Sequence, residues 1–199
     1  TFGINASSGG TPSTGAITIA SGANMNIDTR YLTGSPVQIG SRVYNGSGNI
    51  YIRGGQGITD ASTAQLNAGT MTNFNGNIIV GADSELITDA STSNSATAGT
   101  IYVRENGGLL LNGSSTFNTQ LDLSGNGFLR GSLRQGALYS STSKTISSNI
   151  NLSGNTKIVS TSGSTTTLSG NITQTGTTPY QMAYAANNSS TTSWVITGN

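Results

Sequence analysis

The pattern that decides the fold is clearest in residues 101–111, which read IYVRENGGLLL. Ile101 and Val103 flank Tyr102, so one side of an extended strand is apolar at this point. A five-residue segment containing two glycines follows, and the next apolar position, Leu109, comes eight residues after Ile101. Glycine is typical of sharp bends because it adopts positive φ without steric cost. Residues 101–111 therefore predict two short strands joined by a tight corner.

The same arrangement occurs in four other places in the chain. Each begins with an apolar–x–apolar step and reaches another apolar residue eight positions later, across a corner that contains glycine. Such a corner either closes an antiparallel hairpin or bends a strand that continues around a solenoid, and a single corner is compatible with both. The paired positions are Ile17 and Met25, Ile78 and Leu86, Leu121 and Leu129, and Ile150 and Ile158.

Internal repeats favour the solenoid. The hexapeptide ITDAST of residues 58–63 returns unchanged at residues 87–92, and the tetrapeptide LSGN begins at Leu123, Leu152 and Leu168. Apolar anchors also recur at steps of 20 to 29 residues, which is the length of a coil made of three short strands. The nine anchors are Ile17, Val37, Ile58, Ile78, Ile101, Leu121, Ile150, Ile172 and Trp194.

These patterns predict an all-β fold, a parallel β-helix (β-solenoid) of about nine coils with neighbouring strands about 4.8 Å apart. Residues 1–199 are expected to form one module, either the mature part or an internal slice of a longer or polymerising surface protein. Residues 1–15 are expected to form a flexible start. Residues 180–186 favour a short helix or an irregular excursion, and residues 61–71 favour a second short helix. The alternative fold is an antiparallel β-sandwich of the pilin or adhesin type, because Thr-rich pilins share this composition.

The composition supports a β fold with a polar exterior. Gly, Ser, Thr and Asn number 28, 29, 30 and 21, which is 108 of the 199 residues. Thr and the β-branched aliphatics suit a half-buried pleated surface, and Gly and Asn suit corners. The net charge of +1 argues against a nucleic-acid partner, and no segment predicts membrane insertion. Because the chain contains no cysteine, its stability cannot come from disulfide bonds.

The residues available for catalysis are few. The chain has no histidine and no cysteine, which excludes histidine-based triads, cysteine nucleophiles and most zinc sites. Asp83 and Glu85 are two residues apart and are a candidate carboxylate pair for glycoside hydrolysis, although solvated corner residues are the simpler interpretation. We therefore expect no enzymatic activity, no catalytic residues, no cofactor and no metal.

Two further patterns suggest polysaccharide or calcium chemistry. Arg53 and Arg104 follow matching strands, with Asp60 and Asp89 on a neighbouring corner, as a lyase would require; arginines that keep strand ends soluble are the simpler interpretation. The stretch at residues 54–60 is similar to the glycine-rich nonapeptide of calcium-binding β-rolls, but its aspartate falls one residue late and the unit does not repeat in tandem. One aspartate per coil also provides few of the oxygen ligands that calcium needs.

Residues 121–173, and especially the segment TTTLSGNIT at residues 165–173, resemble the autotransporter-associated β-strand repeat of bacterial autotransporter-type passengers. The resemblance is clearest over residues 99–175. It implies a right-handed parallel β-helix displayed outside a bacterium, where it acts as a stalk, spacer or adhesin.

We therefore expect a structural or adhesive extracellular module of the bacterial cell surface that stacks end to end into filaments. Neither end has a lysine-rich cap of the kind that protects open sheet edges. The candidate self-association residues are Phe2 and Ile4 at one end, and Trp194, Val195 and Ile196 at the other.

The alternative function is a β-helix protein that binds or degrades polysaccharide. Tyr51 and Tyr102 each lie between inward-facing apolar residues and are expected to point outward. They are the candidates for contact with surface glycans, because aromatic rings offer an apolar face together with a polar hydroxyl. Host or abiotic surfaces are further candidate partners.

Overall fold

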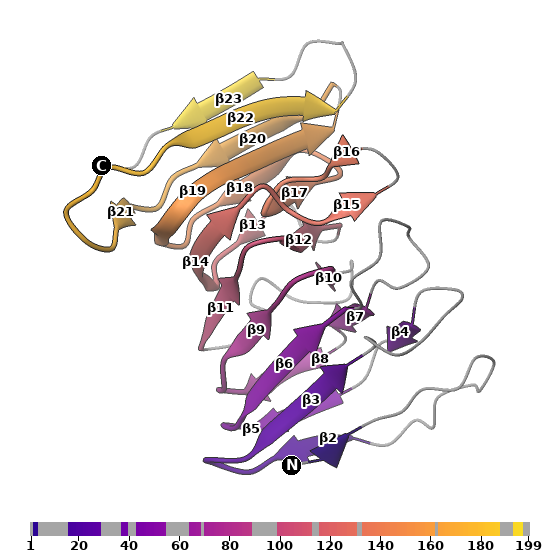
Figure 1. Cartoon of the computed structure of the whole chain (residues 1–199). Helices are drawn as coiled ribbons and strands as arrows, with labels where there is room; N and C mark the ends of the chain where they lie inside the picture. The colour runs from indigo at the N-terminus through magenta and orange to yellow at the C-terminus, as the bar shows by residue number, and fades with distance from the viewer. Residues whose placement is uncertain are drawn as a thin grey trace.

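The computed structural model describes residues 2–3, 16–28, 37–39, 43–54, 64–68, 70–88, 99–112, 116–130, 133–161, 163–187 and 193–196. In these residues all regular structure is β-strand, and the strands wind as a parallel β-solenoid with three faces (Figure 1). Among the described strands only β15 (Leu129–Arg130) and β16 (Leu133–Arg134) pair antiparallel. The predicted all-β parallel solenoid is therefore confirmed, and the antiparallel sandwich is wrong.

The first face is a ladder of parallel strands that runs along the molecule. Its strands are β3 (Asn24–Asp28), β6 (Asn49–Arg53), β9 (Ile78–Val80), β11 (Thr100–Val103), β14 (Gln120–Gly125), the first part of β19 (Ile150–Thr161) and β21 (Ile172–Gln174). The short strand β1 (Phe2–Gly3) pairs with β3.

The second and third faces complete each turn. The second face contains β4 (Val37–Ile39), β7 (Ala64–Ala68), β10 (Ser84–Thr88), β12 (Gly107–Leu111), β17 (Leu138–Ser140), the second part of β19 and β22 (Met182–Asn187). The third face consists of two sheets. One is β2 (Ile17–Ile19), β5 (Val43–Gly46) and β8 (Thr70–Phe74), and the other is β13 (Thr116–Phe117), β18 (Lys144–Ile146), β20 (Thr165–Leu168) and β23 (Ser193–Ile196).

Nine coils is an overestimate, because the chosen anchors lie on different faces. Five of them, Ile78, Ile101, Leu121, Ile150 and Ile172, are register partners in successive rungs of the first face. The predicted spacing therefore holds for about five turns. β6 and β3 extend this ladder toward the N-terminus. Val37 lies on the second face, Ile17 and Trp194 lie on the third, and Ile58 is outside the described residues.

Most of the predicted glycine corners join one face of the solenoid to the next. The corner after Leu121 is different, because Leu129 belongs to the antiparallel pair β15–β16 and not to the second face. Leu138 takes the second-face position instead and pairs with Ile158. This inserted hairpin explains why the step from Leu121 to Ile150 is longer than its neighbours.

The repeats are only partly equivalent in space. Leu123 and Leu152 are register partners, as their shared LSGN predicts. Leu168 instead pairs with Ile146 on the third face, so the third copy of LSGN begins at a different corner. The copy of ITDAST at residues 58–63 lies outside the described residues, but Ile87 pairs with Asn67, so the two copies are not register partners.

The two predicted helices are wrong. Residues 182–187 form β22, which pairs with the second half of β19, and residues 64–68 and 70–74 form β7 and β8. Local helical propensity is a weak preference, and hydrogen bonds to the preceding turn override it here. Apart from Phe2 and Gly3, the expected flexible start at residues 1–15 lies outside the described residues.

Inward-facing aliphatic side chains form one continuous core. Ile50, Ile78, Ile101 and Leu121 occupy one inward column of the first face and have no exposed surface. A buried hydroxyl cluster lies between the second and third faces, where the Ser140 and Thr166 side-chain oxygens are 2.7 Å apart and Ser160 contacts both. Each turn therefore buries its inner surface against the next turn, and stacking stabilises the fold.

Candidate functional site: an outward stripe and two uncharged ends

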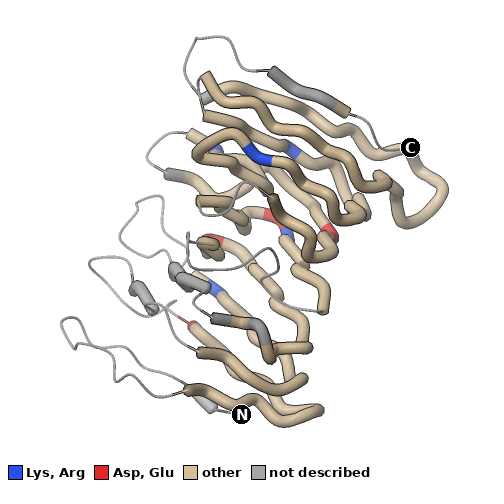
Figure 2. Tube along the Cα trace, turned by 180° about the vertical axis from the view of Figure 1, so that it is seen from behind, with Lys and Arg blue, Asp and Glu red and all other residues tan. Residues whose placement is uncertain are grey.

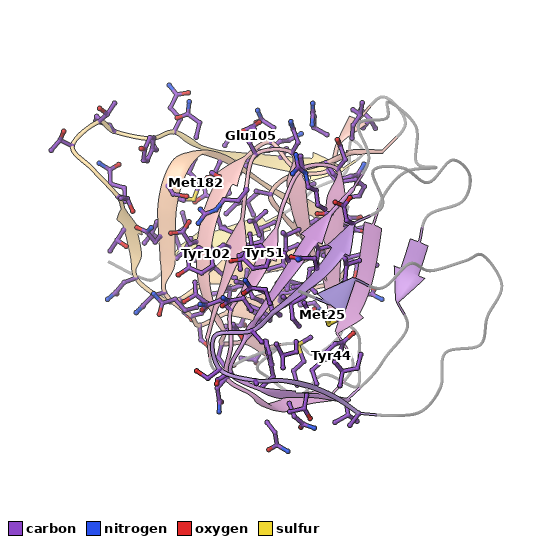
Figure 3. The ribbon with its side chains drawn as sticks, turned by 60° about the horizontal axis from the view of Figure 1, so that its bottom comes forward. Met25, Tyr44, Tyr51, Tyr102, Glu105 and Met182 are labelled. Atoms are coloured by element: carbon purple, nitrogen blue, oxygen red, sulfur yellow. The ribbon has the colours of Figure 1, made fainter. Side chains whose placement is uncertain are left out.

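Outward side chains of the first face form a column that runs across five neighbouring strands. The residues are register partners, and we call them the first-face stripe: Tyr51, Ile79, Tyr102, Asp122 and Asn151. Tyr51 is 37% exposed, whereas its neighbours on β6, Ile50 and Ile52, are buried. The expectation that the two tyrosines point outward is therefore confirmed, and the register places them on either side of one strand (Figure 3).

The polar part of the stripe is a hydrogen-bonded network around Asp122. Oδ1 of Asp122 accepts hydrogen bonds from the Arg104 guanidinium at 2.6 Å and from Oγ of Ser153 at 2.6 Å. Its Oδ2 accepts a hydrogen bond from Nδ2 of Asn151 at 2.6 Å. Asn151 also donates to Oγ1 of Thr175 at 2.8 Å, so the network reaches the next turn. These contacts hold the carboxylate and the amide in defined orientations.

Asp122 is ionised in this setting. Burial acts to raise its pKa, but hydrogen bonds from Ser153, Asn151 and Arg104 and the positive charge of Arg104 outweigh burial and hold the pKa below its usual value of 3.8. The Asp122 side chain is 14% exposed and the Arg104 side chain 42%. The ion pair therefore lies at the surface, with its carboxylate more covered than its guanidinium.

Arg104 also lies over one face of the neighbouring aromatic ring. Its guanidinium carbon lies 4.8 Å from the centre of the Tyr102 ring, within the range of cation–π contact. Ile52 and Val103, which precede Arg53 and Arg104, both pair with Val80, so one strand separates the two arginines, and their stacking in a row stays a prediction. Asp60 and Asp89, the other members of the lyase-like arrangement, lie outside the described residues.

The two carboxylates of the candidate pair, Asp83 and Glu85, do not face the same open surface. Asp83 lies in the corner between β9 and β10 with φ of 53°, and burial raises its pKa although Arg134 opposes this. Glu85 lies on β10 and is only 2% exposed. The two carboxylates therefore differ in solvent access and do not line a common open groove.

Residues 54–60 are the stretch that is similar to a calcium-binding nonapeptide, and the structure describes only Gly54 of them. Close packing between turns explains the glycine at this position. Gly54 is buried, and a Cβ there would collide with the backbone carbonyl of Asp83 in the next turn. Residues 55–60 lie outside the described residues. No group of three or more His, Cys, Asp or Glu side chains that could hold a metal ion occurs among the described residues.

The first and last stretches of the chain carry no charged side chains. All 15 charged residues of the chain lie between Asp28 and Lys157, so residues 1–27 and 158–199 contain none. In Figure 2 the coloured charges accordingly lie between the two ends of the tube. Natural proteins commonly protect open edge strands with charged side chains, especially lysine. The described end strands lack this protection.

Among the described residues, the core is less well covered in the last turn. Ile150, Ile158 and Leu168 are buried, at 1%, 1% and 0% exposure. Their register partners in the last turn are more exposed: Ile172 and Tyr184 are only partly buried, and Ile196 is 49% exposed. Inward-facing positions of this turn therefore lack a covering turn within the described residues.

Of the predicted end residues, the structure describes only some. Ile196 has the exposed side chain expected of an end residue. Phe2, Trp194 and Val195 are described only as parts of β1 and β23, and Ile4 lies outside the described residues. The predicted contact residues at the N-terminal end are therefore untested.

Sequence reasoning missed the Asp122 network. Its members are brought together by register, because Asp122 and Asn151 occupy equivalent positions in segments 29 residues apart. The shared LSGN after both positions is the signal that could have located the pair.

No helix in the described part of the chain is long and apolar enough to cross a membrane. A scan against protein-family models, a search of curated proteins and a search of solved structures each found no match.

Proposed function

We propose that the chain is a non-catalytic structural or adhesive module of the bacterial cell surface, a stalk, spacer or fibre subunit that stacks end to end. The parallel solenoid suits a spacer because its length grows with each added turn while its cross-section stays constant. A cysteine-free chain with a polar surface is compatible with an extracellular position. The autotransporter-like repeat supports the same assignment and implies right-handed coiling, the usual hand of parallel crossover connections.

The observation that carries this proposal is that residues 1–27 and 158–199 have no charged side chain, together with end-strand edges that pair with no further described strand. β21, β22 and β23 each pair with the preceding turn on one side, and their other edges pair with no described strand. Such an edge presents free N–H and C=O groups that a further parallel strand can use. Ile172 and Tyr184 are only partly buried and Ile196 is exposed, so this edge also offers apolar surface that a further turn would bury.

The partner that we propose for this edge is the N-terminal turn of a second copy. At the opposite end β2 pairs only with β5 among the described strands, and Ile17 is partly buried whereas its register partner Tyr44 is buried. Joining two different ends is a heterologous contact, which repeats along an axis and produces a filament. Residues 1–27 and 158–199 carry no charged side chain that would oppose the approach.

Two lysines on the C-terminal edge are expected to abolish this assembly. Ala186 and Ile196 are exposed in the last turn, and Ala186→Lys with Ile196→Lys places charge on an edge that a second copy would bury. The wild-type chain should form filaments that lengthen with protein concentration in negative-stain electron microscopy. The double variant should sediment as a monomer at the same concentrations.

The matched control is Asn118→Lys, which adds a lysine at an exposed position away from both ends. This variant should assemble like the wild type, and circular dichroism should show β structure in all three proteins. A wild-type chain that stays monomeric at every concentration, or a folded double variant that forms filaments as readily as the wild type, contradicts end-to-end stacking.

A further inference from the structure

The aromatic part of the first-face stripe has a spacing that suits a polymer of sugar rings. Tyr51 and Tyr102 each pair with Ile79, so one strand separates them. Two strand spacings place the tyrosine backbones roughly 10 Å apart along the solenoid axis. This distance is close to the length of two sugar rings in an extended glycan. Aromatic rings that repeat at such an interval can pack against every second sugar.

The polar part of the stripe continues the same line. Asp122 and Asn151 follow Tyr102 in the next two rungs. Carboxylate, amide and guanidinium groups are planar, and together they supply the donors and acceptors that sugar hydroxyls require. The network orients these groups before a ligand arrives, which lowers the entropic cost of binding.

The charge of the face selects the class of glycan. The charged side chains on the first-face strands and at their ends are Asp28, Arg53, Arg104 and Asp122, two negative and two positive. Their sum is zero, and Arg104 is already paired with Asp122. The face has no excess positive charge to attract a polyanion.

We propose that the first-face stripe binds a neutral, extended polysaccharide that lies parallel to the solenoid axis. Tyr51, Ile79 and Tyr102 contact the apolar faces of the sugar rings. The carboxylate of Asp122 and the amide oxygen of Asn151 accept hydrogen bonds from the hydroxyls. This site is on the side of the rod, so the proposal does not depend on whether the ends stack.

The test uses a β-1,4-linked hexasaccharide of glucose as the probe and isothermal titration calorimetry as the measurement. Tyr51→Ala and Tyr102→Ala should each weaken binding at least tenfold, and Tyr102→Phe should retain most of the affinity because it keeps the ring. The control is Tyr139→Ala, which removes an outward tyrosine from the second face. Its affinity should equal that of the wild type.

The titrations are repeated on the doubly lysine-substituted edge variant, so that assembly cannot alter the apparent affinity. A hexasaccharide of galacturonic acid is the charged counterpart and should bind more weakly than the neutral probe. Failure of the wild-type chain to bind the neutral hexasaccharide overturns the proposal. Equal binding by the wild type and both alanine variants, or tighter binding of the acidic probe, overturns it as well.

Discussion

Replacing Gly76 with alanine is expected to lower the free energy of unfolding by about 3 kcal/mol or more. Gly76 lies in the corner between β8 and β9 and is buried. A Cβ atom built there would collide with the backbone carbonyl of Gly48 in the preceding turn and would lie 2.7 Å from the Phe74 ring. Because the obstructing atom belongs to the backbone, relief requires a shift between turns.

The cause is the close approach of successive corners. Gly48, Gly76 and Gly99 are stacked in three neighbouring turns, and a Cβ on Gly99 would in turn meet the backbone of Gly76. Urea denaturation followed by circular dichroism measures the loss. The control is Gly22→Ala, because Gly22 has φ of 75° but no atom within 4 Å of the added Cβ. Backbone strain alone should cost this control about 1–2 kcal/mol. If Gly76→Ala costs no more than Gly22→Ala, the turns are not in contact at this corner.

Truncating Ile101 to alanine is expected to cost about 2–5 kcal/mol. Ile101 has no exposed surface and lies between Ile78 and Leu121 in the inward column of the first face. Removing most of its side chain leaves a cavity that neighbours from two adjacent turns line, and a close-packed core fills such a space only partly. Ile101→Val removes one methylene and should cost about 0.5–1.5 kcal/mol.

Leu133→Ala provides the comparison for Ile101→Ala. Leu133 is 58% exposed on the inserted hairpin, so its truncation should change the stability by no more than about 0.5 kcal/mol. The same urea titrations measure all three variants. Similar losses from Ile101→Ala and Leu133→Ala would mean that Ile101 does not face a packed interior.

The sequence predicts the class of fold because its local signals agree with each other. Alternation in segments such as Ile101–Val103 identifies inward residues, and glycine identifies the corners. Spacing alone cannot assign an anchor to a face, so it does not separate Val37 and Trp194, which lie on the second and third faces, from the rungs of the first face. The hairpin of β15 and β16 was missed because Leu129 continues the eight-residue pattern although it has left the solenoid wall.

The same limitation applies to the candidate surfaces. The outward positions of Tyr51 and Tyr102 follow from period-two alternation, which needs no knowledge of the neighbouring turn. The contacts of Asp122 with Asn151 and Ser153 depend on register between segments about 30 residues apart, and local pattern does not specify it. The uncharged ends are visible in the sequence, but the half-open positions of Tyr184 and Ile196 emerge only from the stacking of the last turn.

Register between successive turns is the claim on which the stripe and the stacking ends both depend, and paired cysteines test it most directly in a chain that has none of its own. Thr145 and Thr167 are register partners on β18 and β20, whereas Thr116 lies one rung further from Thr167. Neighbouring rungs about 4.8 Å apart are within disulfide reach, and a separation of roughly 10 Å is not. Mild oxidation should therefore link the pair Thr145→Cys and Thr167→Cys and leave the pair Thr116→Cys and Thr167→Cys reduced. Linkage of the second pair, or of neither, would contradict the parallel ladder.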